Sequence, residues 1–414
     1  MSTILIYTSP AQGHLYPVMD VALSLRQRGH RVHVRSLAAA AEVVRAAGLE
    51  ASALAPAIEA RVVDDWQVSS QLASVKRSVR TFVDRAALEV DDLRQAMAEV
   101  RPDLLLIDTN AWGAQAVAEA EGIPWATWHP FPLPLSDPDV PPFGPGLAPA
   151  RGPLGRLRDR LLSPLVIGPI QAVCEPLNRV RAKVGAHPFD HITELFSAPP
   201  AILYRTSEPF EYTRRHPPGN LHLIGPGLWS PPGGPEPAWL AADDKPILLV
   251  TCSSEYQNDG ALAQAAIDAF GQDPQLRLVC TTAGVDPATV RAPAGVIVER
   301  FAPHAQVLPR AVGVVCHGGM GATQRALAAG VAPVVVPFGR DQLEVARRVV
   351  HAGAGATVSR ARLTADRLRK AVEQARGCGA GVAAVQAGYR AAGGAERGAT
   401  LLEGLLGVRD RASA

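Results

Sequence analysis

The 414-residue chain is long enough for two or three domains with full hydrophobic cores, and a single small module is excluded. Apolar residues make up 47% and charged residues 19%, close to the globular average, so neither wholesale disorder nor a coiled coil fits. The 41 basic and 39 acidic residues leave a formal net charge of +2, which disfavours sequence-independent binding to nucleic acid.

The first half of the chain alternates short apolar runs with helical patterns, which is typical of a parallel sheet with crossover helices. Strands are predicted over 3–7, 31–35 and 104–107. Helices are predicted over 18–28, 38–47 and 112–121. A proline-rich stretch over 130–153 is longer than the usual connection in such folds. We expect this stretch to be a functional or mobile loop.

The same alternation restarts at residue 246. Strands are predicted over 246–251, 276–281, 296–299, 312–316 and 333–337. Helices are predicted over 259–270 and 323–329. The segment 217–245 between the halves is dense in proline and glycine, which suits a semi-rigid connector. The sequence therefore predicts an α/β protein with two similar parallel-sheet halves, the first over 1–216.

Two polar residues follow predicted strands of the first half. His14 ends the segment SPAQGH after the strand 3–7, and Asp108 follows the strand 104–107. Because open parallel sheets bind ligands at the carboxyl ends of their strands, His14 is a candidate general base. Asp108 could bond one imidazole nitrogen and stabilise the imidazolium. Loop packing by His14 and helix capping by Asp108 are the alternatives.

The second half carries polar residues that suit a nucleotide. The turn HGGMGAT (317–323) links a strand to a helix, so its backbone N–H groups and His317 could bind a diphosphate. It is neither a Walker motif nor GxGxxG, which argues against an ATPase and a nicotinamide enzyme. Ser253 and Ser254 suit phosphate oxygens, and Asp341 with Gln342 suits vicinal hydroxyls. Serine and aspartate at such places are also common helix caps.

The chain ends and the cysteines bear on location. The start, MSTILIY, has no basic region and too short an apolar run for a signal peptide, and no run reaches about 18 apolar residues. The five cysteines (174, 252, 280, 316 and 378) have no spacing typical of a zinc site. We expect free thiols, no metal, no membrane span and a cytoplasmic location.

Three segments together resemble the nucleotide-sugar-dependent family 1 glycosyltransferases of the GT-B fold, particularly actinobacterial enzymes that decorate natural products. The most specific is FAPHAQVLPRAVGVVCHGGMGATQRALAAGVAPVVVPFGRDQLEVARR (301–348), and GHLYPVMDVALSLRQRGHRV (13–32) and RPDLLLIDTNAWGAQAVAEAEGIP (101–124) support it. The resemblance implies two Rossmann-like, doubly wound domains that face across a cleft. Residues 1–216 would bind the acceptor, 246–392 would bind the nucleotide sugar, and a helix within 393–414 would cross back to the first domain.

The resemblance also implies a mechanism, an inverting transfer without a metal or another cofactor, in which His14 is the base and Asp108 its partner. Residues implied to hold the donor are Ser253, Ser254, Phe301, Ala302, His304, His317, Gly318, Gly319, Gly321, Ala322, Thr323, Asp341 and Gln342. Aromatic residues of the first half that could line an apolar acceptor cleft, or simply fill the core, include Trp66, Trp112, Trp128 and Phe131.

Some positions depart from the family pattern. Ala322 stands where serine or threonine is common, and Arg325 replaces a glutamate that often grips the ribose hydroxyls. A guanidinium cannot accept the hydrogens of those hydroxyls, so ribose recognition must differ. Two alternatives share the architecture: a sugar-nucleotide 2-epimerase and a non-catalytic activator of another transferase. The expected partners are a nucleotide sugar and a small-molecule acceptor, and a homodimer is compatible with this interpretation.

Overall fold

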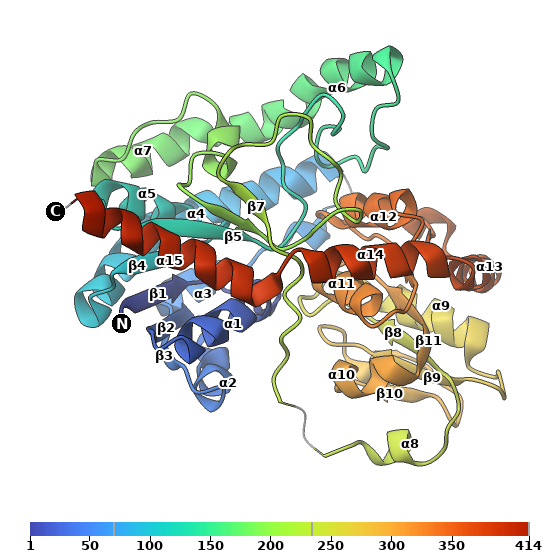
Figure 1. Cartoon of the computed structure of the whole chain (residues 1–414). Helices are drawn as coiled ribbons and strands as arrows, with labels where there is room; N and C mark the ends of the chain where they lie inside the picture. The colour runs from blue at the N-terminus through green and yellow to red at the C-terminus, as the bar shows by residue number, and fades with distance from the viewer. Residues whose placement is uncertain (69–70, 233–234, 413–414) are drawn as a thin grey trace.

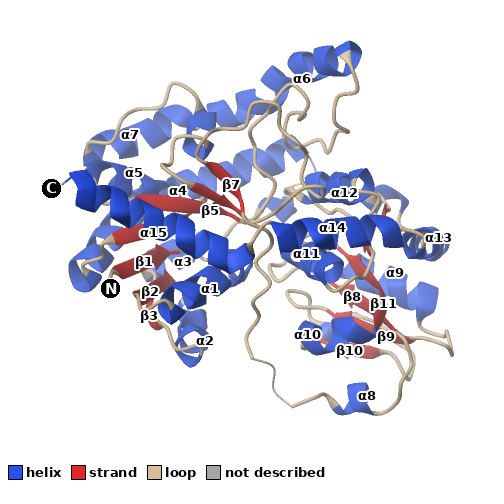
Figure 2. Ribbon diagram, in the orientation of Figure 1, coloured by secondary structure: helices blue, strands red, loops and turns tan. Residues whose placement is uncertain are grey.

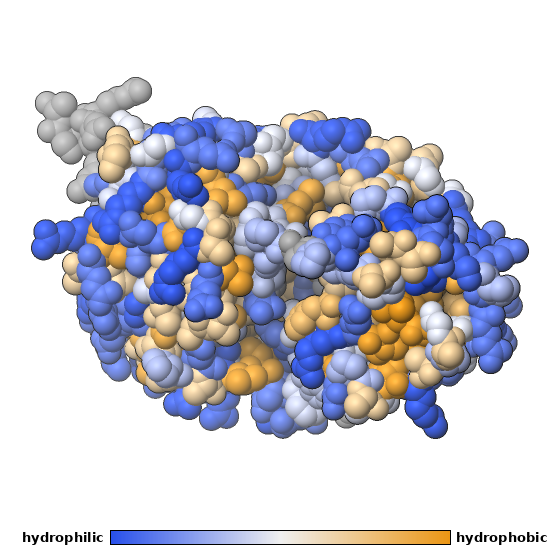
Figure 3. Space-filling model, turned by 90° about the horizontal axis from the view of Figure 1, so that it is seen from below, coloured by the Kyte–Doolittle hydropathy of each residue, from blue (hydrophilic) through white to orange (hydrophobic). Residues whose placement is uncertain are grey.

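Two parallel sheets with helices on both faces make up the protein (Figures 1 and 2). A computed structural model describes residues 1–68, 71–232 and 235–412. The predicted fold class, two doubly wound α/β domains, is confirmed. Seen from below, the surface is hollowed between the two halves (Figure 3).

The first sheet has seven strands in the order β3-β2-β1-β4-β5-β6-β7, and every neighbouring pair is parallel. Its strands are β1 (Thr3–Tyr7), β2 (Arg31–Ser36), β3 (Glu50–Ala53), β4 (Leu104–Asp108), β5 (Trp125–His129), β6 (Ile202–Tyr204) and β7 (Leu221–Leu223). Its helices are α1 (Gln12–Gln27), α2 (Ala41–Ala46), α3 (Pro56–Glu59), α4 (Gln71–Val100), α5 (Trp112–Glu121), α6 (Pro153–Gln171) and α7 (Cys174–Val184).

The second sheet has six parallel strands in the order β10-β9-β8-β11-β12-β13. Its strands are β8 (Ile247–Thr251), β9 (Arg277–Thr281), β10 (Ile297–Glu299), β11 (Ala311–Cys316), β12 (Pro333–Val335) and β13 (Ala356–Thr357). The helices from here to the C-terminus are α8 (Ala238–Ala241), α9 (Gly260–Phe270), α10 (His304–Val307), α11 (Met320–Ala328), α12 (Gln342–His351), α13 (Ala365–Arg376), α14 (Gly379–Ala391) and α15 (Gly394–Ala412).

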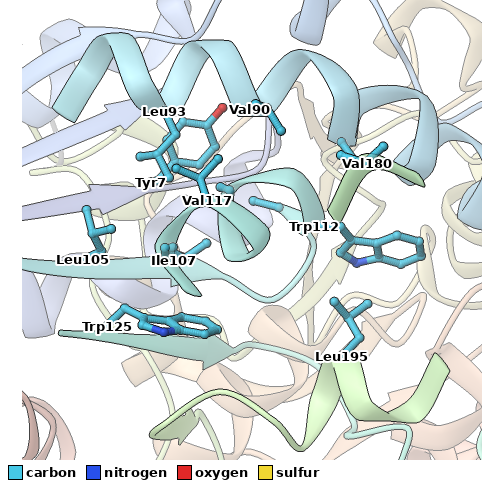
Figure 4. Packing of buried hydrophobic residues seen from close by; sticks show 14 of the residues in the cluster. Tyr7, Val90, Leu93, Leu105, Ile107, Trp112, Val117, Trp125, Val180 and Leu195 are labelled. Atoms are coloured by element: carbon cyan, nitrogen blue, oxygen red, sulfur yellow. The ribbon is translucent and has the colours of Figure 1, made fainter. Parts of the chain in front are cut away.

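Each sheet buries both of its faces, which explains why its central strands β1, β4, β8 and β11 are almost continuously apolar. On one face of the first sheet, Tyr7 and Ile107 pack against α4, α5 and α7, and Figure 4 shows Trp112 and Val180 in the same cluster. On the other face, Ile4 and Ile6 pack against α1 and α15. These cores hold the carboxyl ends of β1 and β4 side by side, since Tyr7 pairs with Ile107.

The C-terminal helices join the two domains. Helix α14 packs on the second domain, where Val385 is buried, and α15 then crosses to α1 of the first domain (Figure 1). There Leu402 enters the core and Arg28 donates to both Glu396 and Glu403. The last helix therefore fastens the second domain to the first.

Two boundaries differ from the sequence prediction. The segment predicted as a connector from residue 217 contains β7, the last strand of the first sheet, because Leu221 and Leu223 continue that sheet between prolines and glycines. Helix α1 begins at Gln12, not at 18, so His14 lies in its first turn and not in a loop. Gly13 and Pro17 resemble loop residues in the sequence, yet both lie within the helix. Pro17 is inside α1 and has no N–H to donate to the carbonyl of Gly13.

The cysteines and the long helices bear on the expectations of free thiols and no membrane span. All five cysteines are free thiols, and four of them are buried. In the part of the chain that the structure describes, no helix is long and apolar enough to span a membrane.

Candidate active site

A histidine and an aspartate meet where β1 and β4 end. The Nδ1 atom of His14 lies 2.9 Å from both carboxylate oxygens of Asp108. Asp108 is fully buried and also accepts hydrogen bonds from the backbone N–H groups of Ser9, at 3.0 Å, and Asn110, at 2.8 Å. Three donors therefore fix the carboxylate, and the carboxylate in turn fixes the imidazole.

The charge of Asp108 sets the basicity of His14. Burial by itself lowers the pKa of His14, but the Asp108 carboxylate outweighs it and holds this pKa above its usual value. Burial likewise raises the pKa of Asp108, and the His14 imidazole and the backbone donors reverse that change, so its pKa is low and it stays ionised. With Nδ1–H donated to Asp108, the Nε2 atom of a neutral His14 keeps its lone pair. This nitrogen can take a proton from a substrate.

The aromatic residues predicted for the acceptor cleft divide into two groups. Phe131 lies beside the base, with its ring centroid 5.9 Å from that of His14, and Trp66 is 40% exposed. Trp112 and Trp128 are core residues, which corrects their assignment to the cleft. Trp112 is buried between α4 and α7, and Trp128 is fully buried and donates from Nε1 to the carbonyl of His14 at 3.2 Å.

The donor side is built around His317 at the end of β11. Its imidazole is buried, and Nδ1 lies 3.5 Å from the carbonyl oxygen of Thr251. Burial lowers the pKa of His317 to about 4, so the ring is neutral without a ligand. Its Nε2 atom lies over Gly319, where a Cβ would approach to 2.5 Å, and Gly318 has a φ of +97°. Glycines are therefore required beneath this imidazole.

Three residues with hydroxyl groups were predicted near the phosphates, and they differ in burial and in hydrogen-bond partners. Thr323 is fully buried and its Oγ1 donates to the carbonyl of Gly319 at 3.0 Å, so this hydroxyl is turned into helix α11. Ser253 is buried and its Oγ accepts from Gln257. Ser254 is exposed. Gly321 and Ala322 lie in the first turn of α11, whose N–H groups point toward the same end of the sheet.

Asp341 and Gln342, predicted together to bind sugar hydroxyls, differ in burial. The Gln342 amide is buried: its Oε1 accepts from the N–H groups of Phe338, at 2.7 Å, and Gly339, at 3.1 Å, and its Nε2 donates to Gln257 at 2.5 Å. It shapes the loop before α12. Burial raises the pKa of Asp341, and the charges of Arg340 and His14 act on it from nearby. Asp341 is half-buried, so its carboxylate is more accessible than the Gln342 amide.

The predicted base-binding residues lie just before α10 and at its start. Phe301 is 61% exposed, Ala302 packs against the core of the second domain, and His304 contacts Thr281 at 3.2 Å. Burial and the nearby charge of Arg325 together lower the pKa of His304 to about 4. Arg325 donates to the carbonyl oxygen of Trp229 at 2.7 Å. It thus ties α11 to the connector between the domains.

Sequence reasoning missed the ion pairs that cross the cleft. Arg340 of the second domain lies 3.0 Å from Asp65 of the first and 2.5 Å from Glu255 of its own domain. Glu255 and Asp341 both act on the pKa of His14, so these charges surround the dyad. No sequence pattern links Asp65 to Arg340. Within the described ranges, no group of three or more His, Cys, Asp and Glu side chains is arranged to hold a metal ion.

Comparison with known proteins identifies the family. Residues 273–389 match the family model described as the C-terminal domain of erythromycin biosynthesis protein CIII-like proteins. The chain is 30% identical to 4'-demethylrebeccamycin synthase from Lentzea aerocolonigenes over 387 residues, which cover 89% of this chain and 90% of that protein. The chain belongs to the family 1 glycosyltransferases. UDP-glycosyltransferase 2 of Phaeomoniella chlamydospora is 27% identical and covers 90% of the chain, with 88% of its own length matched.

Solved structures support the same assignment for this glycosyltransferase. The kitacinnamycin glycosyltransferase superposes with a TM-score of 0.75 at 26% identity, and the match covers 98% of both chains. The calicheamicin glycosyltransferase CalG4 superposes with a TM-score of 0.76 at 22% identity, also over 98% of both chains, which shows the shared GT-B fold. The protein is thus a glycosyltransferase of the antibiotic-biosynthesis type, and the predicted family and enzyme class are confirmed.

Proposed function

We propose that this glycosyltransferase moves a sugar from a dTDP- or UDP-sugar to a hydroxyl group of an apolar or aromatic natural product, with inversion at the anomeric carbon. The observation that carries the proposal is the dyad, with His14 Nδ1 2.9 Å from Asp108. Nε2 of His14 takes the hydroxyl proton while the acceptor oxygen forms its bond to the anomeric carbon. The bond from that carbon to the diphosphate oxygen breaks, and the nucleoside diphosphate leaves with the electron pair.

The dyad suits this step because an alcohol is a weak nucleophile at neutral pH. A positioned base contributes roughly 10²- to 10⁴-fold to such a transfer. Asp108 remains ionised and stabilises the imidazolium that forms, and its buried carboxylate cannot turn away, since two backbone N–H groups also hold it.

The donor side supports a diphosphate leaving group. Negative charge develops on the diphosphate as the bond breaks, and the N-terminus of α11 with His317 offers donors for it. Asp341 would accept hydrogen bonds from sugar hydroxyls. The solved structure of VinC, which has the same fold, is described as a complex with dTDP. No metal ion enters the proposed reaction, so added EDTA should leave the rate unchanged.

The acceptor side supports an apolar or aromatic substrate. Phe131 offers ring surface beside the base, and Trp66 is 40% exposed next to Asp65. The relative 4'-demethylrebeccamycin synthase is named for a natural product.

Replacement of His14 tests the proposal. In His14→Ala, transfer to a hydroxyl acceptor should fall about 10²- to 10⁴-fold, because the base is lost. Stabilisation of the fold by UDP or dTDP should remain, since the donor side is untouched. His216→Ala is the matched control, because His216 is an exposed histidine of the same domain. Undiminished transfer by His14→Ala would refute the assignment of the base.

A further inference from the structure

Arg85 is a buried cation whose pKa responds to the charge of Asp108, the carboxylate of the dyad. It lies on α4 and is 5% exposed. Its neighbour Ala86 touches the start of α5 so closely that a Cβ on Gly113 would lie 1.8 Å from the Ala86 carbonyl oxygen. One turn further along α4, Glu89 accepts the N–H of Gly113 at 2.8 Å. These two contacts hold the stretch of α4 that carries Arg85 against the start of α5, which follows Asp108 after a short loop.

Within the described part of the chain, one carbonyl oxygen serves as the acceptor for this guanidinium. Nε of Arg85 donates to the carbonyl oxygen of Arg61 at 2.8 Å, and Nη2 donates to the same oxygen. Among the described residues, Arg85 forms no ion pair, and Nη1 has no hydrogen-bond partner. Nη1 also keeps some accessible surface, because it is absent from the fully enclosed polar atoms without a partner. A donor thus remains open on an otherwise enclosed cation.

The neighbouring carboxylates do not neutralise Arg85. Burial raises the pKa of Glu89 to about 8, so this side chain is mostly protonated at neutral pH. Asp108 is bound to His14, and Glu255 is bound to Arg340. Burial lowers the pKa of Arg85, and the charges of Glu89, Glu255 and Asp108 oppose this change only in part. A buried charge without a counter-ion destabilises a fold unless something else pairs with it.

We propose that Arg85 binds an anionic oxygen, such as a carboxylate, carried by the acceptor whose hydroxyl group is held at His14. The acceptor class is then an acidic aromatic hydroxy compound, and Arg85 is a specificity residue for it. This inference rests on the proposed function only for placing the acceptor in the cleft beside the dyad. The guanidinium suits the role because a charge-assisted hydrogen bond inside a cleft is stronger than a neutral one.

Equilibrium binding of a matched ligand pair tests the inference. The probes are 3-hydroxy-2-naphthoate and its neutral amide, 3-hydroxy-2-naphthamide, each titrated into the full chain with and without saturating UDP. The wild type should bind the naphthoate about tenfold to a hundredfold more tightly than the amide. Arg85→Gln should lose that preference by weakening only the naphthoate, and Arg85→Lys should retain part of it. Arg80→Gln, an exposed arginine on the same helix, should behave as the wild type.

Thermal unfolding gives a second test, because the result expected here differs from that expected if Arg85 only stabilised the fold. Without ligand, Arg85→Gln should melt at a higher temperature than the wild type, because an unpaired buried charge has been removed. The naphthoate should stabilise the wild type and fail to stabilise this variant.

Several outcomes would overturn the role of Arg85. They are equal binding of the two probes by the wild type, equal weakening of both by Arg85→Gln, binding of neither probe, and a lower melting temperature for ligand-free Arg85→Gln. Because binding is measured without transfer, a failure of this inference leaves the His14 result unchanged, and a failure of the His14 test leaves the ligand preference measurable.

Discussion

The guanidinium of Arg340 lies 3.0 Å from the carboxylate of Asp65, which is 275 residues away in the chain and belongs to the other domain. Arg340 also pairs with Glu255 at 2.5 Å. Beside this pair, the ring of Trp66 meets Tyr256 edge to face, with centroids 4.9 Å apart. These contacts join the domains next to the dyad, so they hold the cleft together where water must be excluded.

Asp65→Asn should loosen this contact. The variant keeps the shape of the side chain but removes its charge, which shifts the balance between closed and open domains by roughly 5- to 150-fold. We expect a lower kcat/KM for transfer and a larger share of donor hydrolysis, both measured by product analysis. Asp64→Asn is the control, because Asp64 pairs with Arg77 within its own domain. An unchanged ratio of hydrolysis to transfer in Asp65→Asn would count against a closing role.

Asp108→Asn should shift the pH dependence of the reaction. The base must be neutral to act, so activity rises as the pH increases through the pKa of His14. Asp108 raises that pKa above its usual value, whereas burial lowers it. Without the carboxylate the pKa falls, and the acid limb of the kcat/KM profile should move to lower pH. The maximal rate should also fall by about 10²-fold or more, because the imidazolium loses its counter-ion. A lower rate with an unmoved limb would contradict the assignment.

Gly319→Ala should displace the imidazole of His317. The added Cβ would lie 2.5 Å from Nε2 of His317, so the ring must move away from the N-terminus of α11. We expect about tenfold weaker binding of whichever of UDP and dTDP binds the wild type, measured by calorimetry. Gly379→Ala is the control, since a Cβ there meets no atom within 4 Å. Full diphosphate affinity in Gly319→Ala would exclude His317 from the donor site.

Arg348→Met should destabilise the junction between the domains. Arg348 is buried and pairs with Glu211 at 2.8 Å and with Glu344 at 3.0 Å. Its removal leaves two buried carboxylates without their counter-ion, a loss of about 3–5 kcal/mol when one partner of a buried pair is removed.

Urea unfolding followed by fluorescence measures this loss. Arg376→Met is the matched control, because its exposed pair with Glu373 is worth only about 0–1 kcal/mol. Equal unfolding midpoints for the two variants would show that the buried network adds no stability.

The strand ends were the part of the site that could be predicted from sequence. His14 and Asp108 follow apolar strands that pair directly, so the general rule for parallel sheets brings them together. The aromatic residues could not be assigned in this way, because Trp112 on an apolar helix face looks the same whether that face meets a cleft or a core. The amide of Gln342 was also beyond prediction, since its partners are two backbone N–H groups and Gln257.

The sequence by itself determined the two-sheet architecture, the family and the dyad, because hydrophobic periodicity, glycine turns and strand-end residues are all local patterns. Only the tertiary structure decided which charges meet across the cleft. The pairs Arg340 with Asp65 and Arg348 with Glu211 depend on how α4, α12 and the loops around them pack. So does Arg85, which forms no ion pair with any residue that the structure describes. Such pairings join residues distant in the chain, and the energy of a charge depends on burial and on neighbours that no local pattern specifies.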